Sequence, residues 1–196
     1  MIRKIILIAL ALVFGKPVYS VNYDGEDSVY YLAKYFGEEY SVELKKSTTA
    51  GLSSNAILLR ELAIKVLADP SIIENQISFL NNFPNNYQGF TSMFQEYEGV
   101  KSTSLVENNF IYIKFLNKLS LKYPEKGALI YVGISKEACF SADLLNYFRD
   151  GLKGFIRHYN YYFELEKNKL SDTEIININN FLKAKLYGDL SCKDRV

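Results

Sequence analysis

The chain has 196 residues, with 23 basic and 22 acidic side chains and a formal net charge of +1. Its Lys and Arg residues form no dense block, which argues against nucleic acid as a partner, because neutralising phosphates requires clustered basic side chains. It has one histidine and two cysteines, and it lacks Ser-x-x-Lys, Gly-x-Ser-x-Gly, His-Glu-x-x-His and phosphate-loop sequences. These features favour a protein that is not an enzyme and uses no cofactor or metal.

The first 20 residues have the pattern of a secretory signal peptide. Arg3 and Lys4 precede an apolar run over residues 5–14, which is shorter than the roughly 20 residues of a membrane-spanning helix. Pro17 follows, and small side chains predict cleavage after Ser20. A buried N-terminal strand or helix is the alternative. We expect a periplasmic or secreted protein with no stable membrane anchor after cleavage, and a single helical exported domain over residues 21–196.

An exported protein meets oxidising conditions, which favour disulfides, and this chain has two cysteines, Cys139 and Cys192. We predict that they pair, and that the bridge ties the C-terminal tail to the core. In the chain-entropy model, closing a loop of about 54 residues stabilises a protein by roughly 4 kcal/mol. Two unpaired thiols are the alternative.

Apolar side chains at helical spacing predict two helices in the first part of the exported domain. The first covers residues 29–36 and ends near Gly37. The second has its apolar face over residues 59–67 and ends at Asp69-Pro70, because the residue before a proline disfavours helix. Residues 45–51 are polar and without period, which predicts an exposed loop between the two helices.

A third helix is predicted to turn Ile73, Ile77 and Leu80 inward and to stop by Phe83-Pro84. Sequences of the form Ser-x-x-Glu predict capping boxes, in which the serine and glutamate satisfy amides of the first helical turn. Three such sequences precede apolar segments: Ser71 to Glu74, Ser104 to Glu107, and Ser171 to Glu174.

Residues 81–90 combine many turn-forming residues with three aromatic rings. One interpretation is an exposed loop whose amides and rings bind a partner or a sugar, with Asn85, Asn86 and Tyr87 as candidate contact residues. The other is an ordinary loop whose rings pack into the core.

The segment from Ser104 to Lys122 and the segment after Pro124 are both predicted to be helices. Their β-branched and aromatic content also fits strands. The alternative fold is therefore α+β, with a small hairpin made from residues 110–115 and 128–134.

The clearest element is a long helix that starts near Ser141, with a seam of apolar residues from Leu145 to Tyr162 at alternating spacings of three and four. Gly151 and Gly154 lie within it and are expected to permit close helix packing. A last helix starts at Asp172 and ends near Gly188. The fold class predicted by the whole pattern is all-α, a single-domain bundle of about six to seven helices with one disulfide.

Aromatic residues make up 15% of the chain, and the tyrosines near the end of the long helix point in several directions around it. Such an excess fits a binding interface, and it fits equally the codon bias of an AT-rich genome. Further candidate contact residues here are Arg157, His158 and Tyr161.

Paired carboxylates are the one catalytic class that this composition allows, since glycoside hydrolysis needs little more than Glu and Asp. Three clusters are visible: Glu38 with Glu39, Glu96 with Glu98, and Glu164 with Glu166. Each is more simply a solvated face. The corresponding hypothesis is a carboxylate-dependent cell-wall glycan hydrolase or glycan binder.

The favoured hypothesis is an exported, non-enzymatic helical protein that binds another envelope or secreted protein, for example as an inhibitor or immunity protein that blocks a toxin. This plan is similar to that of the small helical periplasmic immunity proteins of type VI amidase toxin systems. The similarity is limited to this overall plan, because no motif residues of that family can be assigned to positions in this sequence. A structural component of an envelope secretion assembly is a third hypothesis.

Overall fold

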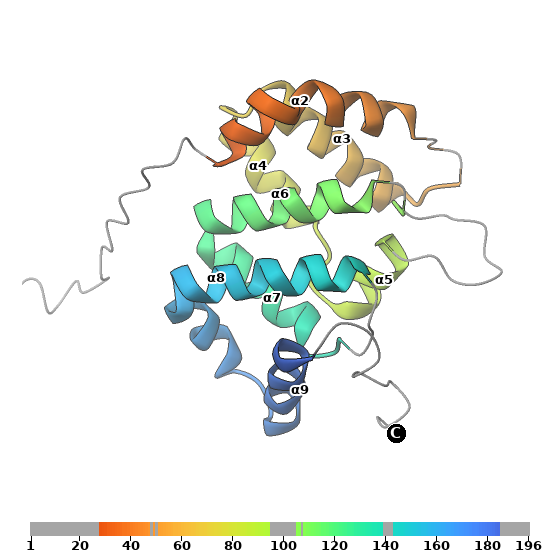
Figure 1. The fold of residues 1–196 in the computed structure, drawn as a ribbon. Helices are drawn as coiled ribbons and strands as arrows, with labels where there is room; N and C mark the ends of the chain where they lie inside the picture. The colour runs from red at the N-terminus through yellow and green to blue at the C-terminus, as the bar shows by residue number, and fades with distance from the viewer. Residues whose placement is uncertain are drawn as a thin grey trace, which may run out of the picture.

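The computed structural model describes residues 28–47, 49, 51–94, 105–106, 108–138 and 143–184. This part of the chain is all-helical, as expected, and it contains eight helices rather than six to seven (Figure 1). They are α2 (Ser28–Lys46), α3 (Ser54–Ala68), α4 (Ile73–Asn82), α5 (Tyr87–Phe94), α6 (Asn109–Lys122), α7 (Pro124–Ser135), α8 (Asp143–Lys167) and α9 (Asp172–Lys183). The predicted signal peptide, Cys139 and Cys192 lie outside the described residues.

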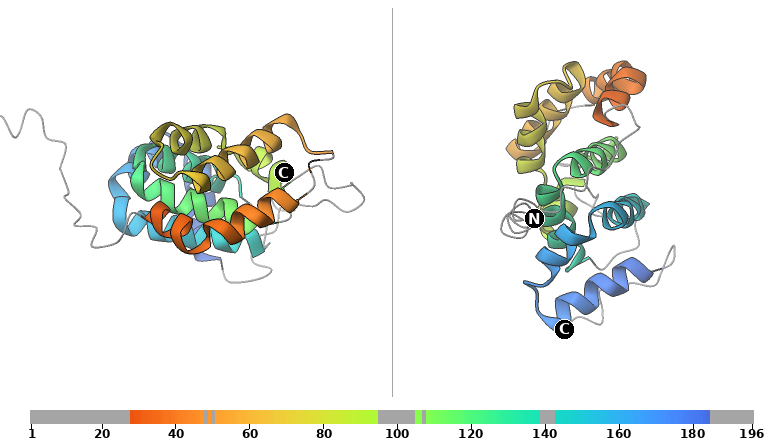
Figure 2. Two further views of the ribbon diagram at one scale, coloured as in Figure 1. Left: turned by 90° about the horizontal axis from the view of Figure 1, so that it is seen from above. Right: turned by 90° about the vertical axis from the view of Figure 1, so that its left-hand side faces the viewer.

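The helices lie in successive layers along the chain (Figures 1 and 2). At one end, α2 packs on α3, and α3 packs on α4. The next layer is α6, which contacts α2 on one side and α8 on the other. At the far end, α9 packs on α7 and α8. None of the helices in the described ranges is both long and apolar enough to cross a membrane.

A chain of aromatic rings in contact runs through the core. Phe79, Phe83, Phe94 and Phe90 follow one another with ring centroids 5.3–5.9 Å apart. Phe90 then meets Phe148 on α8 at 5.4 Å, and Phe148 meets Tyr131 at 5.1 Å. Tilted pairs at this distance stabilise a core beyond the burial of their area. Much of the aromatic excess is therefore core.

The hairpin alternative is wrong, because residues 110–115 lie inside α6 and residues 128–134 lie inside α7. Both helices are buried on several sides, so their apolar residues show no clean helical period and imitate strands. Pro124 occupies the first turn of α7, as predicted.

The first helix is longer than predicted, since α2 continues through Gly37 to Lys46. Tyr40 and Leu44 extend its buried face beyond the glycine. The Arg60 side chain on α3 then closes the end of α2, because its Nε donates to the Leu44 carbonyl at 2.7 Å. A cation at a helix C-terminus satisfies the last carbonyls and favours the helix dipole. Lys45 and Lys46, predicted to be loop, are the last turn of this helix.

The capping box predicted at Ser71 is wrong. The Ser71 hydroxyl donates instead to Asp69 Oδ1 at 2.6 Å, and this bond with the Ser71 amide lowers the pKa of Asp69. The register of α4 also differs, because Ile73 is exposed whereas the polar Gln76 is buried with Phe79. The α4 helix ends at Asn82, as predicted.

The capping box at Ser171 is confirmed. Its hydroxyl accepts from the Glu174 amide, and the Glu174 carboxylate accepts from the Ser171 amide at 2.9 Å. Ser104 and Glu107 of the remaining predicted box lie outside the described residues.

Candidate functional site

The long helix α8 has a buried inner face and an exposed outer face. Leu145, Phe148, Leu152 and Phe155 form the inner face and are almost wholly buried. They pack against α6 and α7, which is the seam predicted from their spacing. Such a stripe makes the helix amphipathic and leaves the opposite side to solvent or to a partner.

A kink divides α8 at Tyr159, whose backbone has φ −135° and ψ 42°. The Tyr159 ring is half-buried and meets the Phe155 ring at 5.8 Å. Burial of this hydroxyl raises the pKa of Tyr159, and the neighbouring Tyr162 adds to the shift. Beyond the kink the helix turns toward α9 (Figure 1). The outer surface of α8 therefore consists of two faces that point in different directions.

The outer face before the kink, which we call the central stripe, consists of Tyr147, Asp150, Gly154 and Arg157. These residues follow one another at spacings of three and four, so they lie along one side of the helix. Tyr147 is 59% exposed. Asp150 and Arg157 are exposed, and neither has an ion-pair partner among the residues that the structure describes.

The outer face around and beyond the kink, which we call the terminal face, consists of His158, Tyr161 and Leu165. Tyr161 is 61% exposed and Leu165 is 47% exposed. His158 is also exposed, and its Nδ1 lies 2.8 Å from the Gly154 carbonyl oxygen. Because a carbonyl oxygen can only accept, Nδ1 is the donor in this contact.

The predicted contact residues on the other segment serve the fold. The Asn86 side chain accepts from the Gly89 amide at 2.7 Å and so starts α5. The Tyr87 ring is half-buried against the core. Asn85 is exposed, but its backbone fills the space beside Gly133 on α7, where a Cβ would overlap the Asn85 carbonyl. The interpretation of residues 81–90 as a segment whose rings pack inward is the better one.

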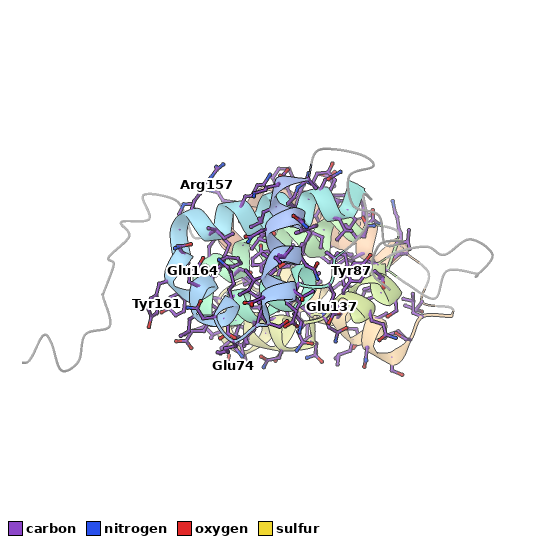
Figure 3. All side chains as sticks on the ribbon, turned by 90° about the horizontal axis from the view of Figure 1, so that it is seen from below. Glu74, Tyr87, Glu137, Arg157, Tyr161 and Glu164 are labelled. Carbon is purple, nitrogen blue, oxygen red and sulfur yellow. The ribbon has the colours of Figure 1, made fainter. Side chains whose placement is uncertain are left out.

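The structure does not bring the predicted contact residues together in one site. Tyr87 lies at one end of the molecule, whereas Arg157 and Tyr161 lie at the other end and point outward in different directions (Figure 3). The candidate site is therefore restricted to the outer surface of α8.

Sequence reasoning missed Tyr147, Asp150 and Leu165. The helical period could have identified them. Steps of three or four residues lead back from Arg157 through Gly154 to Asp150 and Tyr147, and one step of four leads from Tyr161 to Leu165. Of the two glycines predicted to permit close packing, only Gly151 does so within the described part of the chain: a Cβ there would overlap the Asn117 side chain, whereas one at Gly154 meets no described residue within 4 Å.

The described carboxylates of the predicted clusters are engaged in ion pairs or exposed. Glu164 accepts from Lys167 at 2.9 Å and Glu166 from Lys169 at 2.6 Å, while Glu38 and Glu39 face solvent. Glu96 and Glu98 lie outside the described residues. Within the described ranges no three His, Cys, Asp or Glu side chains are grouped to hold a metal ion.

Comparison with protein-family models, with curated proteins and with solved structures finds no match to this chain. The functional argument therefore depends on the surface of α8 itself.

Proposed function

We propose that this chain is an exported, non-enzymatic protein that binds a protein partner in the periplasm or outside the cell, and that the terminal face of α8 makes the contact. The observation that carries the proposal is the exposure of Tyr161 and Leu165, two large apolar side chains one helical turn apart. A tyrosine supplies a large, rigid apolar surface with a hydroxyl, and such residues dominate the binding energy of many interfaces.

The chemistry around this pair fits a protein partner. His158 belongs to the same face, three residues before Tyr161, and is exposed. An aromatic anchor, an aliphatic neighbour and a polar residue beside them are the composition of an interface core with a polar rim.

Site-specific photo-crosslinking tests the proposal. A photoreactive residue in place of Tyr161 should give one dominant crosslinked product in the native envelope. The matched control is the same replacement at Ile73, an exposed apolar residue on α4, which α6 separates from α8 (Figure 1). Equal yields at both positions, or no product at Tyr161, would contradict the proposal.

The captured partner then allows a measurement of affinity. Tyr161→Ser with Leu165→Ser should weaken binding about 30-fold, which corresponds to the loss of roughly 2 kcal/mol at an interface anchor. Ile73→Ser should leave the affinity unchanged. A toxin as the captured protein would make this an immunity or inhibitor protein, and a secretion component would make it an assembly protein.

The export proposal includes cleavage after Ser20 and a bridge between Cys139 and Cys192. Both are tested by the mass of the protein recovered from the envelope. It should begin at Val21, and it should gain the mass of two hydrogens on reduction. An uncleaved chain, or no change on reduction, would contradict the respective part.

A further inference from the structure

The central stripe of α8 contains a glycine that the described part of the fold does not require. Among the described residues, a Cβ at Gly154 would meet nothing within 4 Å, and the residue lies at the middle of the outer side of the helix. Glycine in a helix interior costs roughly 1 kcal/mol relative to alanine. Three residues earlier, Gly151 has a clear reason, since its missing Cβ makes room for Asn117. The open space at Gly154 is instead what the close approach of another backbone needs.

The charges on either side of Gly154 are arranged symmetrically. Asp150 lies four residues before it and Arg157 three residues after it, both exposed and without an ion-pair partner in the described part of the chain. In a second α8 that runs antiparallel across this point, Asp150 of each copy faces Arg157 of the other. A parallel arrangement would place like charges opposite each other.

We propose that two copies of this chain associate through the central stripe, with their α8 helices antiparallel and crossing at Gly154. A two-fold interface uses the same patch on both copies, so that each residue contacts its counterpart reciprocally. The stripe satisfies this condition with one acidic group, one basic group and a small residue at the axis. Tyr147, 59% exposed, covers each end of the contact with a large apolar ring.

This dimer goes beyond the proposed function, because it uses a different face and needs no other protein. The kink at Tyr159 separates the two faces, and Tyr161 points in a different direction from Arg157 of the central stripe (Figure 3). Two copies joined before the kink thus keep both terminal faces for a partner.

Sedimentation equilibrium of the purified mature chain, over a range of concentrations, tests the proposal. The wild-type chain should form dimers. Asp150→Arg and Arg157→Asp should each weaken the dimer at least about tenfold, because each puts like charges opposite each other at two symmetric positions. The double variant that exchanges the two charges should recover the affinity of the wild type, and an equimolar mixture of the two single variants should form heterodimers.

Two further variants separate dimerisation from folding. Gly154→Gln should give a monomer whose thermal stability at low concentration is at least that of the wild type, because glutamine favours helix. Glu61→Arg reverses an exposed charge on α3 and should leave the dimer intact.

A wild-type chain that stays monomeric up to about 1 mM, a limit that corresponds to roughly 4 kcal/mol of association, would overturn the proposal. Failure of the exchanged variant to recover dimers would overturn the antiparallel arrangement. A loss of partner crosslinking at Tyr161 alone would bear on the proposed function and not on the dimer.

Discussion

Two glycines three residues apart on α8 have opposite environments. Gly151 lies against the Asn117 side chain, which accepts a hydrogen bond from the buried Tyr131 hydroxyl at 2.7 Å. A Cβ at Gly154 would meet none of the described residues within 4 Å. The same amino acid thus permits internal packing at one position and leaves a free helix surface at the other.

Alanine at these positions should change the stability in opposite directions. Gly151→Ala should lower the free energy of unfolding by about 1–3 kcal/mol, because Asn117 must move and Tyr131 loses its acceptor. Gly154→Ala should raise it by up to about 1 kcal/mol through helix propensity alone. Urea unfolding of dilute protein measures both. Effects of the same sign would show that the two environments are not as described.

The carboxylate of Glu174 links α9 to α7. It accepts from Lys136 at 2.8 Å and from the Ser171 amide and hydroxyl, and these bonds, with the Lys136 bond the largest cause, lower the pKa of Glu174 from 4.5 to about 2. A carboxyl group whose pKa is lower in the folded than in the unfolded state stabilises the fold above its unfolded pKa. That contribution is lost as the pH falls from about 4.5 toward about 2.

Glu174→Gln should therefore lower the melting temperature at pH 7, and the difference from the wild type should shrink between pH 4.5 and pH 2. Glutamine keeps the capping-box geometry, so the variant isolates the charge. Glu61→Gln, on an exposed surface, is the control and should show no comparable dependence. A difference that stays constant down to pH 2 would contradict the assigned role.

At the residue scale, the sequence predicted the groups whose role is local and missed those whose role is tertiary. The capping box at Ser171 needs only its own helix, and it was predicted correctly. Ser71 has the same pattern, but Asp69 competes for its hydroxyl. Tyr87 was predicted as a contact residue because its segment is rich in turn formers, whereas its partial burial depends on residues far away in the sequence.

Among the elements, α2 and α6 are linked by an edge-to-face contact of the Tyr40 and Phe110 rings and by the ammonium group of Lys114. Lys114 Nζ donates to the Tyr40 hydroxyl at 2.6 Å and lies 5.1–5.7 Å from the centroids of the Phe36, Tyr40 and Phe110 rings. A cation over an aromatic face is stabilised by the negative charge density of the ring. The Lys114 side chain thus holds the outer layer to the central helix.

Lys114→Met removes the charge and keeps the aliphatic stem, so it should lower the free energy of unfolding by about 1–2 kcal/mol. Lys114→Arg retains a cation and should cost less. The matched control is Lys118→Met, one turn further along α6, where no such cluster exists among the described residues. Chemical denaturation gives the three values, and equal losses for the methionine variants at 114 and 118 would contradict the role of the rings.

How well the sequence predicted each helix depended on how much of the helix surface is buried. The long helix α8 has one buried and one exposed side, and its seam was visible in the sequence. The buried sides of α6 and α7 are so wide that the helical period is obscured, which is why a hairpin remained an alternative. The extension of α2 beyond Gly37 depends on Tyr40, Leu44 and the Arg60 cap, of which the cap is a contact between two helices.

Over the whole molecule, polar contacts connect the layers at a few points. Arg149 on α8 donates to the Ala184 carbonyl at 2.7 Å and so holds the end of α9. At the other side, Gln76 on α4 is completely buried, donates to the Pro70 carbonyl and accepts from the Tyr123 hydroxyl at 2.8 Å. No pattern in the sequence indicates the Arg149–Ala184 and Gln76–Tyr123 pairs, because each connects residues that are far apart along the chain.

The Gln76–Tyr123 contact lies where the first layers meet the junction of α6 and α7, so a double-mutant cycle can measure how firmly the two parts are joined. Gln76→Leu should lower the free energy of unfolding by about 2–4 kcal/mol, because it removes the donor to Pro70 and the acceptor of Tyr123 inside the protein. Tyr123→Phe alone should cost about 1 kcal/mol, the usual net value of one hydrogen bond. The two losses should not add. The double variant should be more stable than their sum predicts by roughly 1 kcal/mol. The reason is that Gln76→Leu already removes this acceptor of the Tyr123 hydroxyl, so that Tyr123→Phe then has less to remove. Strictly additive losses would mean that the Gln76 side chain stabilises only α4 and the segment before it. The layers would then be held together by packing of the aromatic chain.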